Sequence, residues 1–143
     1  MKYIVITFIL IGVLFSCAKD DSSPDLEEQI SFTGVWKRQF EAGLGNLHDV
    51  SYKIYQDSIR YKISGSIGNA DYVILKKEFT ARNDRFIGFN PDNKFHYVLF
   101  FKEISDKNIT IYKKEVFSFE KAQLVKFPAS DNTENHGWNT FGK

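Results

Sequence analysis

Apolar and polar residues alternate along most of the chain that follows residue 30. In 50–54 and 59–63, for example, every second residue is apolar, and a short polar stretch around Gln56-Asp57 separates the two runs. A period of two predicts β-strands that bury one face, and a separation this short predicts a hairpin. The predicted strands cover residues 32–40, 50–55, 59–63, 71–81, 85–89, 95–101 and 109–117.

Short polar turns join all of these strands, which is typical of an antiparallel up-and-down sheet. An open sheet of this size would expose two unpaired edges, and closure into a barrel removes them. The tail after Ala129 is polar except for Trp138 and Phe141, and it can supply a short closing strand. The sequence therefore predicts an all-β fold, an up-and-down barrel of about eight strands.

Residues 118–126 break this period and predict one short C-terminal helix. Ser118 is a suitable N-cap, and Phe119, Ala122 and either Leu124 or Val125 would share one face at helical spacing.

The strand at 95–101 is apolar on both faces. Such a strand is buried on both sides or presents one side to a partner.

The first seventeen residues form a different pattern, in which Lys2 precedes an apolar run from 3 to 15. This run of about 13 residues is shorter than the roughly 20 that a membrane-spanning helix needs, so it predicts a signal peptide. Leu14-Phe15-Ser16-Cys17 resembles the lipobox of bacterial lipoproteins. The resemblance implies cleavage before Cys17, a diacylglyceryl group on its thiol and an acylated amino terminus, which together anchor the chain in a membrane.

The resemblance also implies a cellular location and a domain organisation. Lys19-Asp20-Asp21 resembles the surface-export tag of some gram-negative lipoproteins, so we expect an outer-membrane protein, on the cell surface rather than the periplasmic face. The predicted segments are a signal peptide (1–16), a lipidated cysteine with a polar, flexible tether (17–29) and a barrel domain (30–143).

Charge excludes one class of partner. The sequence holds 19 basic and 18 acidic side chains, and removal of residues 1–16 takes away only Lys2, which leaves 18 of each. A chain without a basic excess has no electrostatic footprint for nucleic acid. Cys17 is the only cysteine, so its acylation leaves none for a disulfide or a thiolate metal site.

Gly34-Val35-Trp36 opens the first predicted strand and matches the G-x-W signature of lipocalins, so the predicted barrel resembles this family. The resemblance implies that Trp36 packs across the closed end of the barrel and that Gly34 allows a close backbone approach. It also implies a basic residue near the final strand beside the tryptophan, for which Lys113 and Lys114 are the candidates.

No pattern of catalytic or metal-binding residues stands out. His48, His96 and His136 lie far apart without an H-x-H pair, although distant histidines can still converge on zinc. Residues 64–68 contain serine and glycine but no G-x-S-x-G nucleophile motif. We therefore predict no catalytic residue, no metal, no cofactor and no enzymatic activity. His96 shares a strand face with apolar residues and is expected to be a hydrogen-bonded residue that lines the barrel.

An eight-stranded barrel is wide enough either to fill itself with side chains or to hold one small ligand. Our first hypothesis is a lipocalin-like module that binds a small apolar or amphipathic ligand in the barrel mouth near the loop 41–47. The expected lining residues are Tyr52, Tyr61, His96 and Tyr97. The second hypothesis is an accessory or inhibitory lipoprotein whose filled barrel binds another protein through its outer surface.

Overall fold

The computed structural model of this chain describes residues 32–43, 45–65, 68–80 and 84–143. The predicted signal peptide, the lipidation site at Cys17 and the predicted tether lie outside these residues.

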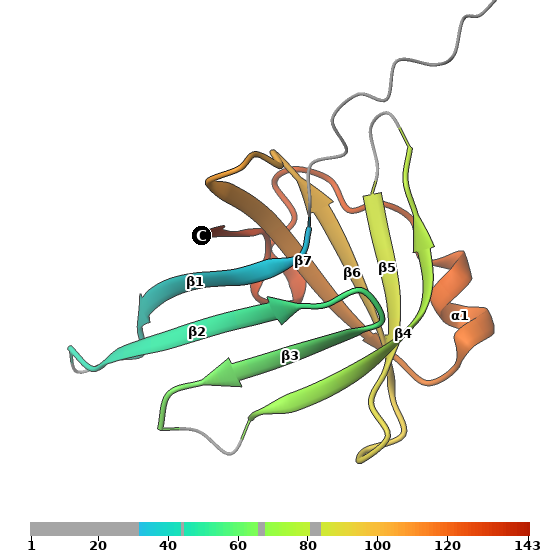
Figure 1. Cartoon of the computed structure of the whole chain (residues 1–143), viewed down its shortest axis with the longest axis horizontal. Helices are drawn as coiled ribbons and strands as arrows, with labels where there is room; N and C mark the ends of the chain where they lie inside the picture. The colour runs from blue at the N-terminus through green and yellow to red at the C-terminus, as the bar shows by residue number, and fades with distance from the viewer. Residues whose placement is uncertain (1–31, 44, 66–67, 81–83) are drawn as a thin grey trace, which may run out of the picture.

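Eight antiparallel strands form a closed up-and-down barrel in which each strand pairs with the next one along the chain (Figure 1). This confirms the predicted fold class. The strands are β1 (Gly34–Glu41), β2 (Leu47–Ile54), β3 (Ser58–Ile63), β4 (Ala70–Glu78), β5 (Asp84–Phe89), β6 (His96–Lys102), β7 (Asn108–Val116) and β8 (Asn139–Gly142). Between β7 and β8 the chain forms the helix α1 (Phe119–Leu124) and the 3-10 turn η1 (Glu134–His136). No helix in the described ranges is long and apolar enough to cross a membrane.

The closing strand β8 is paired to different extents on its two sides. All four of its residues are in register with β7, from Asn108 to Ile111. Its register with β1 contains one pair, Lys37 with Gly142. Residues 34–36 and 38–41 of β1 therefore pair with β2 on one side and have no registered β8 partner on the other. Strand β8 closes the barrel against β1 at one pair in the middle of β1.

Aromatic side chains fill the closed end of the barrel. Trp36 is fully buried there, and its indole N–H donates a hydrogen bond to the carbonyl oxygen of Phe32 at 2.8 Å. The ring of Phe32 lies 5.1 Å from that of Phe86 and 5.0 Å from that of Phe101, measured between centroids. This end therefore has a solid aromatic core.

The residues around Trp36 correct the expectation about its basic neighbour, and the group that approaches Gly34 is a side chain. Gly34 has φ of +144°, a conformation that favours glycine, and a Cβ atom there would lie 2.9 Å from Cε of Lys143. The ammonium nitrogen of Lys143 lies 5.1 Å from the centroid of the Trp36 ring. The basic residue beside the tryptophan is thus Lys143. The prediction of Lys113 or Lys114 is wrong, because β7 pairs these residues with the middle of β6, away from the closed end.

The strand β6 is buried on both faces, as one of the two alternatives predicts. Tyr97, Leu99 and Phe101 belong to the barrel core. Val98 and Phe100 belong to a second apolar cluster outside the barrel, beneath α1 and the segment that follows it. Figure 1 shows α1 on the outside of the barrel wall. The protein thus covers the second face of β6 with its own chain.

The helix α1 is capped and docked as its sequence indicates. The Ser118 hydroxyl oxygen accepts a hydrogen bond from the backbone N–H of Lys121 at 3.2 Å, which confirms the predicted N-cap. Val125 packs in the outer cluster, whereas Leu124 is 80% exposed. Val125 is therefore the residue that shares the packed face with Phe119 and Ala122. The guanidinium of Arg85 donates to the carbonyl oxygen of Val125 at 2.9 Å and fixes the end of the helix to β5.

We predict that Trp36→Ala lowers the free energy of unfolding by about 3 to 5 kcal/mol, because it leaves a cavity at the closed end. Urea unfolding followed by circular dichroism measures this change. Val73→Ala serves as the control: Val73 is 48% exposed on the outer face of β4, and its truncation should change the free energy by less than about 0.5 kcal/mol. A loss at Trp36 as small as that at Val73 would contradict the role of the aromatic core.

Candidate functional site

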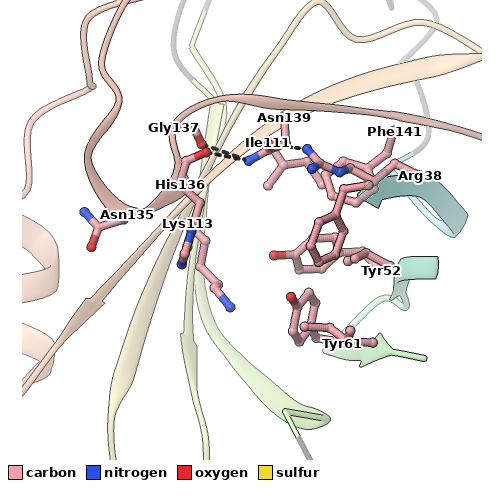
Figure 2. A pocket seen from close by; sticks show the side chains of 13 residues that line it. Arg38, Tyr52, Tyr61, Ile111, Lys113, Asn135, His136, Gly137, Asn139 and Phe141 are labelled. Carbon is pink, nitrogen blue, oxygen red and sulfur yellow. Dashed lines mark hydrogen bonds between the residues drawn. The ribbon is translucent and has the colours of Figure 1, made fainter. Parts of the chain in front are cut away.

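A cavity of about 200 Å³ lies inside the open end of the barrel, where β1 loses its β8 partner (Figure 2). Its apolar wall includes Val50, Ile63, Ile111 and Phe141, from β2, β3, β7 and β8. These side chains point inward because every second residue of a strand faces the barrel interior.

The cavity opens at the end of the barrel where the sequence predicts a site, but its rim differs from the prediction. The described residues of the predicted loop, 41–43 and 45–47, do not line it. The rim is formed by 135–137 in and after η1, which lies against β7. The tail that closes the barrel therefore also borders its mouth.

Arg38 reaches the cavity from β1 because it faces inward, two residues after the buried Trp36. Its guanidinium carbon lies 5.5 Å from the ring centroid of Phe40 and 5.8 Å from that of Phe141. Contacts of this kind between a cation and an aromatic face are attractive. The same guanidinium donates a hydrogen bond to Oδ1 of Asn139 and so links β1 to β8 above their one registered pair.

A second cation, Lys113, enters the cavity from β7. Its ammonium nitrogen lies 4.2 Å from the ring centroid of Tyr61 and 5.7 Å from that of Tyr97. Burial lowers the pKa of Lys113, and the nearby charge of Glu115 partly opposes this shift. Across the described ranges, neither Lys113 nor Arg38 forms an ion pair. The cavity thus carries two positive groups without an ion-paired carboxylate.

Tyr52 and Tyr61, two of the expected lining residues, lie side by side in the cavity wall. Their ring centroids are 4.9 Å apart, and the ring of Phe141 meets that of Tyr52 edge-on at 5.1 Å. Figure 2 shows both hydroxyl groups pointing into the cavity. Burial raises the pKa of Tyr52 well above its ordinary value and raises that of Tyr61 as well. Both hydroxyls therefore keep their protons at neutral pH and can donate hydrogen bonds.

Tyr97 faces the barrel interior but lines a different hollow. Its hydroxyl donates to Glu115 at 2.6 Å and accepts from the amide of Asn93 at 2.7 Å. Burial raises the pKa of Tyr97 to about 12, and the hydrogen bond to the Glu115 carboxylate contributes to the shift. This residue lines a second, more open hollow of about 480 Å³ next to the cavity, and the two hollows share Lys113, Asn135 and His136.

His96 does not line the barrel, and the prediction that it does so is wrong. Tyr97 and Leu99 occupy the interior, so the alternate positions of β6, including His96, face outward. The imidazole lies 5.0 Å from the Phe89 ring and 6.3 Å from that of Phe119 in α1. Its Nδ1 atom is buried and has no hydrogen-bond partner in the described part of the chain, so the expected hydrogen bond is not seen at that atom.

The rim has an unusual backbone. Asn135, His136 and Gly137 have φ values of 51°, 72° and 65°, so three consecutive residues are left-handed. Non-glycine residues adopt this conformation at an energetic cost, and such residues often occur at binding and catalytic sites. The Asn135 amide donates to the Tyr112 hydroxyl at 2.9 Å, which helps to hold the rim in place.

The sequence reasoning missed Arg38, Lys113 and the rim. The alternation of strand residues could have indicated Arg38, because an inward Trp36 places Arg38 on the inner face of the same strand. Lys113 follows Ile109 and Ile111 at the same spacing. No comparable signal marks the rim, since its left-handed residues other than glycine have no clear sequence signature.

The three histidines lie in different environments. His48 stacks on Phe40 with 5.5 Å between centroids and contacts the carbonyl oxygen of Ser64, His96 lies outside the barrel, and His136 belongs to the rim. The residues that the structure describes contain no group of three or more histidine, cysteine, aspartate or glutamate side chains that could hold a metal. The predictions of no metal, no cofactor and no catalytic residue stay predictions.

Comparisons with protein-family models, with curated proteins and with solved structures find no match for this chain.

We predict that Lys113→Met raises the free energy of unfolding at pH 7, because methionine removes a buried charge while filling similar space. Burial lowers the pKa of Lys113 in the folded protein from its ordinary value of about 10.5. As the pH rises towards 10.5, the folded chain therefore loses this proton before the unfolded chain does, and the wild type gains stability. The advantage of the variant should therefore shrink towards pH 10.5.

Urea unfolding at several pH values measures this difference, in which the tyrosines common to both proteins largely cancel. Lys114→Met, at the next position of the same strand, is the control, because Lys114 does not line the cavity. Equal effects of the two substitutions, or an advantage that grows with pH, would contradict the burial of the Lys113 charge.

Proposed function

We propose that this chain is a membrane-anchored lipoprotein whose lipocalin-like barrel binds one small amphipathic molecule in the cavity at its open end. The observation that carries the proposal is the cavity itself, which combines an apolar wall with the two inward hydroxyls of Tyr52 and Tyr61. An apolar wall with a few convergent polar groups is typical of small-molecule sites.

The size of the cavity limits the ligand. Its volume of about 200 Å³ is below the roughly 300 to 1,000 Å³ of pockets for drug-sized molecules. It nevertheless exceeds several times the volume of one water molecule, about 30 Å³. A compact molecule with a short apolar body and one polar end fits this volume.

The lipocalin-like part of the proposal rests on the arrangement at the closed end. Trp36 is buried and donates a hydrogen bond to the carbonyl oxygen of Phe32. Gly34 leaves room for the side chain of Lys143 beside the indole ring. The anchoring part rests on the lipobox that ends at Cys17, and the proposed location is the outer membrane, with the barrel on the cell surface.

A protein-binding role is the second candidate, because two large apolar residues are half exposed on the outer face of β4. Val73 is 48% exposed and Leu75 is 47% exposed. Exposed apolar surface of this kind can mark an interaction site. A substitution inside the cavity separates the two candidates, since it leaves this outer face unchanged.

We predict that Ile63→Trp blocks the cavity and abolishes ligand retention, because Ile63 is a wall residue at the open end. Native mass spectrometry of the full-length protein in detergent should detect a small bound molecule on the wild type and none on this variant. Lys62→Trp adds the same ring to the same strand at an exposed position and should keep the ligand. Equal retention by the wild type and Ile63→Trp, or none by the wild type, would contradict binding in the cavity.

We predict that Cys17→Ser removes the anchor, because a serine hydroxyl does not form the thioether that the lipobox implies. After cell fractionation, the variant should be found outside the membrane pellet. Mass spectrometry of its amino-terminal peptide should show no acyl groups. Ser16→Ala keeps a small residue before the cleavage site and should leave both results as in the wild type. A variant at Cys17 that stays in the membrane fraction would overturn the proposed anchoring.

A further inference from the structure

The charge inside the cavity is unbalanced. Arg38 and Lys113 enter it from β1 and β7, the two strands that flank β8, and neither forms an ion pair across the described chain. The carboxylate next in line, Glu115, accepts the hydroxyl of Tyr97 at 2.6 Å and lines only the adjoining hollow. A partly buried cation without an ion-paired carboxylate costs free energy, which an anion at the same place would offset.

The guanidinium of Arg38 is held in position by a chain of hydrogen bonds from the rim. The side-chain amide of Asn139 donates to the carbonyl oxygens of His136 and Gly137, at 3.1 Å each. Its oxygen then accepts the bond from Arg38. The left-handed rim thus orients the asparagine, and the asparagine orients the arginine (Figure 2).

Arg38 has donors to spare in this position. A guanidinium carries five N–H donors, and hydrogen bonds to charged groups are stronger than those between neutral ones. Lys113 offers a second set of donors, and Tyr61, whose ring lies under its ammonium group, offers a hydroxyl. These three side chains line one space. The guanidinium and the ammonium group can only donate and the hydroxyl can donate as well, so they match a group that only accepts hydrogen bonds.

We propose that the cavity binds a small organic carboxylate, with its charged end between Arg38 and Lys113 and its apolar body against Tyr52 and Phe141. The rings of Tyr52 and Phe141 lie edge to face at 5.1 Å and offer a surface for a flat or branched body. This inference rests on the proposed small-molecule function and adds the charge of the ligand. A planar carboxylate also matches the planar fork of an arginine.

Three probes of nearly equal size and different charge test the inference: benzoate, benzamide and benzylamine. Isothermal titration calorimetry of the full-length protein in detergent micelles at pH 7, with micelles alone as the blank, gives their affinities. Benzoate should bind at least about tenfold more tightly than benzamide, because hydrogen bonds to a charged group contribute about this much. Benzylamine should bind more weakly than either.

Substitutions then assign the effect to the two cations. Arg38→Met and Lys113→Met should each weaken benzoate about tenfold more than they weaken benzamide. Lys37→Met removes an exposed cation from the adjacent position of β1 and should leave the preference for benzoate unchanged. Circular dichroism confirms that each variant is folded, and Lys113→Met, which replaces a buried charge, provides the result if Arg38→Met does not fold.

The outcomes separate this inference from the proposal on which it rests. Benzamide binding as tightly as benzoate, or a benzoate preference that survives both substitutions, would overturn the carboxylate site while leaving a small-molecule cavity in place. Binding of none of the three probes would contradict the small-molecule function and this inference together.

Discussion

The incomplete pairing between β1 and β8 determines the rest of this structure. Barrel closure requires the last strand to join the first, and here one registered pair, Lys37 with Gly142, makes that join. Below it, aromatic rings pack around Trp36 into a solid core. Above it, the wall depends on the bond from Arg38 to Asn139 and on the rim that follows η1. The short strand β8 thus closes the barrel and also borders the cavity.

A filled and a hollow barrel are therefore not alternatives for this protein. The half around Trp36, Phe86 and Phe101 is filled, and the opposite half is open. Because the filled half supplies most of the apolar core, the open half is free to place polar and charged groups inside. Arg38 and Lys113 occupy inward positions that would otherwise hold core residues, so the open end contributes less to stability than an apolar interior would.

Sequence patterns predicted the strands and their closure well, because alternation over short segments is a strong local signal. They predicted the inner and outer faces less well. The assignment of His96 to the interior failed because a period of two does not say which set of residues faces the core, and a shift by one residue exchanges the faces. The partner of Trp36 is Lys143, brought there by the closing strand rather than by β7. The rim at 135–137 depends on tertiary contacts, so no local pattern indicates it.

Phe32, the first residue described, packs against Trp36 at the end of the barrel remote from the cavity. The described chain therefore begins at the filled end of the barrel, and the cavity opens at the other end. A surface or a partner that contacts the filled end would leave the entrance of the cavity accessible to solutes.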